Sequence, residues 1–131
     1  MRWMRYLTGA LVALALLIPG ASADISPDLY DTLTKTATTT TTVTESVFWT
    51  PATGFRIILQ GCALSTDAAN RISVLSASAH VIPPQEFQSY GSVVIEGGGT
   101  AIWAGTTNAT LTWTTTTKTA ASIMCWGYEI K

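Results

Sequence analysis

Strand-length runs of apolar and β-branched residues, separated by clusters of turn residues, fill the chain from residue 43 onward. The clearest alternation lies at 108–115, where Ala109, Leu111 and Trp113 share one face and polar residues occupy the other. A period of two is typical of a β-strand that buries one face. We therefore expect about seven strands, at approximately 43–50, 55–64, 72–81, 92–96, 100–104, 108–115 and 121–130.

Residues with turn chemistry divide these strands. Pro51-Ala52-Thr53-Gly54 predicts a hairpin turn, Pro83-Pro84 an extended crossover and Gly97-Gly98-Gly99 a tight reversal. No segment with a helical period lies between the strands, which favours an antiparallel sandwich or barrel. A second buried face is expected from four apolar residues of 55–64 that alternate with their neighbours: Phe55, Ile57, Leu59 and Ala63.

The last strand is apolar on both faces. Ile123 and Cys125 share one face, and Met124, Trp126 and Tyr128 share the other, together with Ile130. A strand that is apolar on both sides is typical of a central strand, or of one whose outer face is covered by another subunit. Met124, Trp126 and Tyr128 are therefore candidate interface residues.

The first 23 residues have the features of a cleavable signal peptide. Arg2 and Arg5 precede an apolar run at 7–18, which is shorter than the roughly 20 residues that span a bilayer. Ala21-Ser22-Ala23 forms a small-x-small cleavage site, so we expect the mature chain to begin at Asp24. The alternative is an uncleaved N-terminal anchor. The expected location is secreted or cell-surface, with no membrane association after cleavage.

Residues 24–42 are rich in threonine and differ from the domain expected at 43–131. Thr38 through Thr42 is an uninterrupted threonine run. β-branched residues favour extended backbone, but this run offers no apolar face. Three interpretations stay open: an edge strand, a flexible stalk or linker, and a strand completed by a partner.

The chain has two cysteines, Cys62 and Cys125, each within a predicted strand. A disulfide is the natural inference for an exported chain with an even number of cysteines. Two buried free thiols and a metal site are the alternatives, although no second cysteine or histidine stands at ligand spacing.

Charge excludes some classes of partner. Without the signal peptide the chain keeps five basic and eight acidic side chains, and the basic ones are scattered. We therefore expect no nucleic-acid partner, because such binding needs clustered Lys and Arg. We also expect no cofactor, no metal and no enzymatic activity: His80 is the only histidine, and no Gly-x-Ser-x-Gly motif or phosphate-binding loop is present.

Three polar or aromatic positions are candidates for contact with other molecules. Trp49 and Trp103 lie near predicted turns, where an exposed indole ring could stack on a sugar or contact a protein. Asn108-Ala109-Thr110 is a formal N-glycosylation acceptor, which we expect on the polar face of its strand.

Two segments carry a family resemblance. The run from Phe48 to Leu59, with Thr50-Pro51-Ala52-Thr53-Gly54 at its centre, resembles the opening hairpin of small jelly-roll modules of phage particles and prokaryotic surface proteins. The closing Ile123-Met124-Cys125-Trp126-Gly127-Tyr128-Glu129 is similar to their final strand. These modules are akin to tumour-necrosis-factor and C1q head domains. The resemblance implies a jelly-roll sandwich, first and last strands side by side, and frequent assembly as trimers; such adjacency would suit a Cys62–Cys125 bond.

The sequence thus favours a secreted, non-catalytic β-sandwich module that acts in self-assembly or surface attachment, as a homo-oligomer. A carbohydrate-binding module that uses Trp49 or Trp103, with a glycan or cell-surface partner, is the alternative from another class. A small secreted hydrolase that uses His80 is the remote third.

Overall fold

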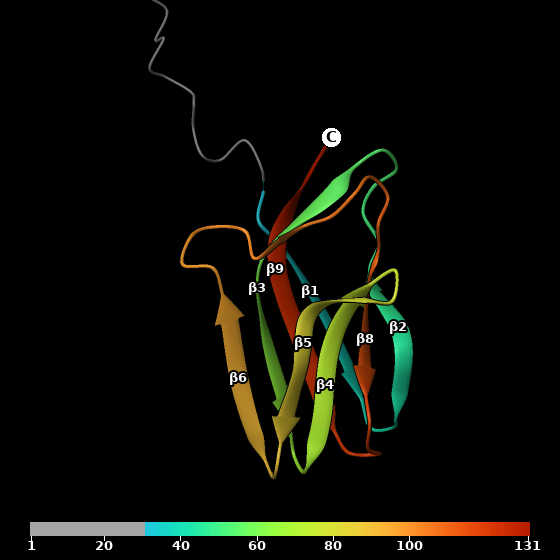
Figure 1. Ribbon diagram of the computed structural model, residues 1–131, viewed down its shortest axis with the longest axis vertical. Coiled ribbons are helices and arrows are strands. Elements are labelled where there is room, and N and C mark those ends of the chain that lie inside the picture. Colours follow the sequence, from blue (N-terminus) through green and yellow to red (C-terminus); the bar gives the residue numbers. More distant parts are fainter. Residues whose placement is uncertain (1–30) are drawn as a thin grey trace, which may run out of the picture.

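Two antiparallel sheets packed face to face make up residues 31–131, the part of the chain that the computed structural model describes (Figure 1). The five-stranded sheet has the order β1-β9-β3-β6, with the short β7 also beside β3, and the four-stranded sheet has the order β2-β8-β4-β5. The strands are β1 (Leu33–Thr39), β2 (Val43–Trp49), β3 (Arg56–Thr66), β4 (Asn70–Ser76), β5 (Ala79–Phe87), β6 (Gly91–Glu96), β7 (Trp103–Ala104), β8 (Leu111–Thr115) and β9 (Ala121–Ile130).

The predicted all-β antiparallel sandwich is confirmed. The signal peptide predicted at 1–23 and its cleavage before Asp24 lie outside the described residues. Within them, Leu33–Thr39 of the threonine-rich segment forms β1, an edge strand that pairs with β9. Leu33 and Ala37 pack against the core, whereas the threonines between and beside them face solvent.

The single strand predicted at 72–81 is wrong, because the chain reverses at Ala77 and Ser78 and forms the β4–β5 hairpin. Both residues have positive φ, 48° and 64°. A two-residue hairpin of this kind needs left-handed backbone at both central positions, which Asn and Gly adopt most readily. Ala-Ser carries no such signal, so sequence alone did not reveal the turn.

Two further turn assignments change. Pro51–Gly54 is not a hairpin turn: it carries the chain from β2 in one sheet to β3 in the other. Pro83 and Pro84 lie inside β5 rather than in a crossover. β5 is an edge strand, where the missing proline N–H costs no ladder hydrogen bond if that side faces solvent. The predicted reversal at Gly97–Gly99 is confirmed, with positive φ at Gly98 and Gly99.

The core lies between the sheets and is aliphatic with two tryptophans. Leu111 and Trp113 are buried as predicted. The register between β3 and β9 shifts between Leu59 and Gly61. The buried face of β3 therefore continues from Ile57 and Leu59 to Cys62 and Leu64. The expectation that Ala63 shares this face is therefore wrong, because one extra residue in a bulge moves every later side chain to the opposite face.

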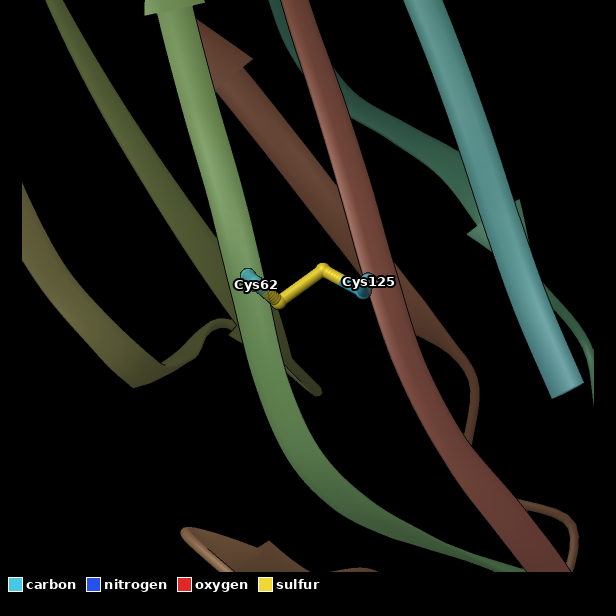
Figure 2. The surroundings of a disulfide bond; sticks show 2 residues. All are labelled: Cys62 and Cys125. Atoms are coloured by element: carbon cyan, nitrogen blue, oxygen red, sulfur yellow. A yellow bond between two sulfur atoms is a disulfide. The ribbon is translucent and has the colours of Figure 1, made fainter. Parts of the chain in front are cut away.

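Cys62 and Cys125 form a disulfide between β3 and β9 (Figure 2). They are direct partners in the antiparallel register, and both side chains are fully buried. The predicted bond is confirmed, and neither cysteine is a free thiol or a metal ligand. Structural disulfides are typical of proteins that fold in an oxidising compartment.

Candidate functional site

The outward side chains of β9 form the centre of an exposed face on the five-stranded sheet. Met124, Trp126 and Tyr128 alternate with the buried Ile123, Cys125 and Gly127, so the three candidate interface residues share the face that points away from the core. The alternation predicted for this strand is therefore seen in the structure.

Strand register extends this face sideways across the sheet. Val94 on β6 and Met124 on β9 both pair with Ala63 on β3, and Met124 pairs with Thr36 on β1. Val94 is 59% exposed and Met124 43% exposed, two of the four large apolar side chains that the described residues leave open to solvent. A continuous apolar row thus crosses three strands and ends against the threonines of β1.

Trp126 packs against the β3 backbone at Gly61, where the absence of a side chain makes room for its ring. A side-chain carbon at position 61 would collide with the Trp126 ring, which covers the β3 backbone at the bulge. The ring is half-buried, so one side packs on the sheet and part of it faces solvent. We call the set Val94, Ala63, Met124, Trp126 and Tyr128 the outer patch.

The outer patch differs from the usual outward face of an antiparallel sheet, which is polar where it meets water. Single exposed apolar residues are normal on a protein surface, whereas contiguous ones mark sites of interaction. Val47, 54% exposed on the four-stranded sheet, pairs with Thr112 and lies outside the patch.

Trp49 is not available to a ligand. It is 1% exposed, and its Nε1–H donates to Glu129 Oε1 at 2.9 Å; the Ala52 N–H donates to the other carboxylate oxygen at 2.8 Å. The candidate role of Trp49 in ligand contact is therefore wrong: the register between β2 and β8 shifts between Val47 and Trp49, and the Trp49 side chain lies in the core. Trp103 is half-buried and packs against the core and Gly105.

Asn108 lies in a turn before β8 rather than on the polar face of a strand. Its φ is 63°, it is exposed, and its Oδ1 accepts a hydrogen bond from the Gly54 N–H at 2.7 Å. The placement predicted for this acceptor was wrong because β8 begins only at Leu111.

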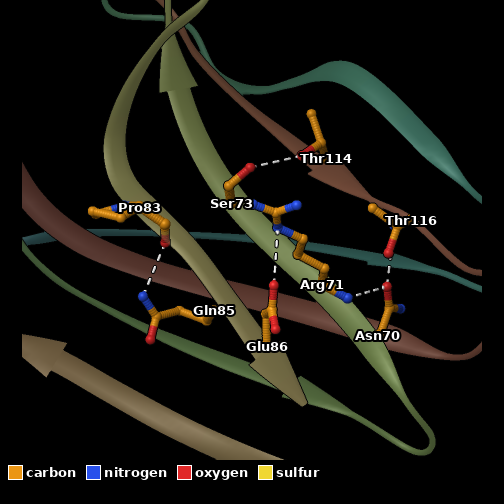
Figure 3. A network of polar contacts seen from close by, with 8 residues as sticks. All are labelled: Asn70, Arg71, Ser73, Pro83, Gln85, Glu86, Thr114 and Thr116. Carbon is orange, nitrogen blue, oxygen red and sulfur yellow. Dashed lines mark hydrogen bonds and ion pairs between the residues drawn. The ribbon is translucent and has the colours of Figure 1, made fainter. Parts of the chain in front are cut away.

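His80 is exposed on the edge strand β5 and lines a shallow groove of about 240 Å³ with Arg71, Ser73 and Thr114. The neighbouring polar groups are already paired (Figure 3): Arg71 lies 3.7 Å from Glu86, and the Ser73 and Thr114 hydroxyls are 2.8 Å apart. Among residues 31–131, no hydroxyl of this groove is hydrogen-bonded to the His80 ring.

Asn70 closes the end of the four-stranded sheet beside this groove. It is 5% exposed, and its Oδ1 accepts N–H groups from Arg71 at 2.8 Å and from Thr116 at 3.1 Å (Figure 3). Its Nδ2 donates to Thr119 Oγ1 at 3.0 Å. These contacts account for Asn70 as a structural residue that holds the β8–β9 connection.

A larger groove, which sequence reasoning missed, opens at one end of the five-stranded sheet, where β1 and β3 end and β9 begins. It has a volume of about 520 Å³ and includes Thr38, Asp67, Ser122 and Tyr90. Tyr90 is 82% exposed. An isolated aromatic residue in a predicted loop has no periodicity, so the sequence carried no signal for this site beyond the ring itself.

Within residues 31–131 no group of three or more His, Cys, Asp or Glu side chains is placed to hold a metal ion. The same part of the chain contains no helix long and apolar enough to cross a membrane.

In comparisons with known proteins, no protein-family model and no curated protein matches this chain.

Proposed function

We propose that this chain is an exported, non-catalytic β-sandwich module that self-associates through the outer patch. The observation that carries the proposal is the row of Val94, Ala63 and Met124 across three strands, flanked by the half-exposed Trp126 ring. Burial of such a surface stabilises an association by roughly 25 cal/mol per Å² of apolar area removed from water.

A second copy of the chain is the occupant that the surface chemistry favours. The patch holds no charged side chain; it is bordered by Glu96 on β6, which pairs with Gly61, and by Arg56 on β3, which pairs with Ile130. Without the signal peptide the chain has five basic and eight acidic side chains, a formal balance of only −3, so long-range repulsion between copies is modest. A sheet face whose centre holds no charge can pack on its own copy about a symmetry axis without opposing like charges there.

The nesting of the strand pairs supports a jelly-roll assignment. With the two-residue β7 set aside, β1 pairs with β9, β2 with β8, β3 with β6 and β4 with β5. In sequence order, the two strands of each pair flank the strands of the next pair, as in one long hairpin that is folded over into two sheets. Assembly modules of this architecture are the group that the sequence resembles, and trimers are frequent among them.

Export is supported by two independent features. The disulfide suits an oxidising compartment, and the first 23 residues have the sequence features of a signal peptide. A module at the cell surface or outside the cell is the location that both favour.

Sedimentation velocity of the processed chain, from low to high micromolar concentration, tests the self-association. The wild-type mass should rise with concentration. Met124→Lys places a charge in the patch and should weaken association at least tenfold, about 1.4 kcal/mol. Val47→Lys is the matched control, because Val47 is similarly exposed on the other sheet, and it should sediment as the wild type does.

A wild-type chain that stays monomeric across the whole range would contradict the proposal. So would equal weakening by both substitutions, because that would attribute association to general surface hydrophobicity rather than to the outer patch.

A further inference from the structure

The groove at the end of the five-stranded sheet is bordered by the ends of three strands. Thr38 and Thr40 border it from the end of β1, Ser65 and Asp67 from the end of β3, and Ser122 from the start of β9. In Figure 1 these ends gather at the lower tip of the sandwich, beside the connection from β5 to β6 that carries Tyr90.

The walls of this groove are held by hydrogen bonds within the protein. The Ser65 and Ser122 hydroxyls are 2.6 Å apart across β3 and β9. The Asp67 N–H donates to the Ala120 carbonyl at 3.0 Å, and the Thr66 hydroxyl donates to the same carbonyl at 3.3 Å. The backbone that carries the Asp67 carboxylate is therefore fixed before any ligand arrives, which reduces the entropy lost on binding.

Polar groups at the rim remain open. Among residues 31–131, the side chains of Thr38, Thr40, Asp67 and Tyr90 form no hydrogen bond or ion pair. All four residues are exposed. They present hydroxyls that donate and accept and a carboxylate that accepts, around one groove.

Tyr90 adds an apolar ring to these polar groups. It is 82% exposed and takes no part in the hydrophobic core, so core packing does not explain its position. A phenol ring offers a flat apolar face and a polar tip, which suits ligands that have both characters.

We propose that this groove binds a neutral saccharide. A sugar ring has a C–H face that packs on the Tyr90 ring, and hydroxyls that pair with Asp67 and with Thr38. An anionic ligand is disfavoured, because the groove contains one carboxylate and no Lys or Arg. An apolar ligand is disfavoured because it would leave these polar groups without water or partners.

Isothermal titration calorimetry of the processed chain with cellohexaose, chitohexaose, mannohexaose and maltohexaose tests the proposal. At least one should bind. Tyr90→Ala should then weaken binding at least tenfold, whereas Tyr90→Phe should keep most of it because the ring remains. Asp67→Asn should weaken binding, since it replaces a charged acceptor by a weaker neutral one. His80→Ala, in the other groove, is the control and should bind as the wild type does.

Absence of binding by all four sugars at millimolar concentration would overturn the proposal, as would binding that survives Tyr90→Ala. The result is separable from self-association, because Tyr90 is not part of the outer patch. Tyr90→Ala should leave the sedimentation series unchanged, and Met124→Lys should leave the calorimetric affinity unchanged.

Discussion

At the scale of single residues, Glu129 shows how a few polar contacts close one end of the sandwich. It lies near the end of β9, and its carboxylate accepts N–H groups from Trp49 and Ala52, at 2.9 and 2.8 Å. These contacts join the last strand of one sheet to the end of β2 in the other. Trp49 can therefore be buried with its indole N–H satisfied, which a tryptophan in a core requires.

Glu129→Gln should lower the free energy of unfolding by about 1–3 kcal/mol. The amide keeps one acceptor oxygen, but its NH2 group replaces the other and meets an N–H donor. Urea unfolding followed by tryptophan fluorescence measures the change. Glu86→Gln is the control: the Glu86–Arg71 pair is exposed and 3.7 Å apart, and its loss should cost at most about 1 kcal/mol. Equal midpoints for Glu129→Gln and wild type would contradict this role.

At the scale of elements, the β3–β9 pair is the central unit of the five-stranded sheet. It has ten residue pairs in register, and the disulfide joins the two strands near their middle. The bond closes a loop with a sequence separation of 63 residues, so in the chain-entropy model it stabilises the fold by about 4 kcal/mol.

Removal of this bond should therefore destabilise the domain strongly. The double variant Cys62→Ala, Cys125→Ala should lose about 2–5 kcal/mol of unfolding free energy in urea. In the presence of reductant, the urea midpoint of the wild-type protein should also fall, whereas the midpoint of the double variant should not change. A wild-type midpoint that reductant leaves unchanged would count against the bond as a stabilising element.

The elements also show what sequence patterns could and could not predict. Alternation placed most strands to within a few residues, and both faces of β9 were assigned correctly, because inward and outward positions differ in polarity along one strand. Alternation says nothing about which strand lies in which sheet. The Pro51–Gly54 segment therefore looked like a hairpin turn, although it connects the two sheets.

Local backbone irregularities were the other source of error. The turn at Ala77-Ser78 uses residues without a turn signature, and the bulge in β3 was missed although Gly61, a residue type that marks bulges inside strands, lies beside it. Trp49 was a candidate for ligand contact because it precedes a turn, but its indole N–H is bonded to Glu129, 80 residues later in the sequence. The groove beside Tyr90 is assembled from four separate segments, and no local pattern could predict it.

At the scale of the whole molecule, the two sheets differ on their outward faces. The four-stranded sheet carries paired hydroxyls and an exposed ion pair, as at Ser73–Thr114 and Arg71–Glu86. The five-stranded sheet carries the outer patch and, at one end, the Tyr90 groove. A module with one associating face and one separate groove could assemble and attach at the same time, and this is the arrangement that we propose.

The most direct measurement of the central proposal is the oxidation rate of Met124 by dilute peroxide, followed by peptide mass spectrometry over the concentration range of the sedimentation series. Met124 is the only methionine in residues 31–131, and it is 43% exposed in a single copy of the chain. If copies associate through the outer patch, the oxidation rate should fall as the mass rises. An oxidation rate that stays constant while the mass rises would place the contact elsewhere and contradict the account.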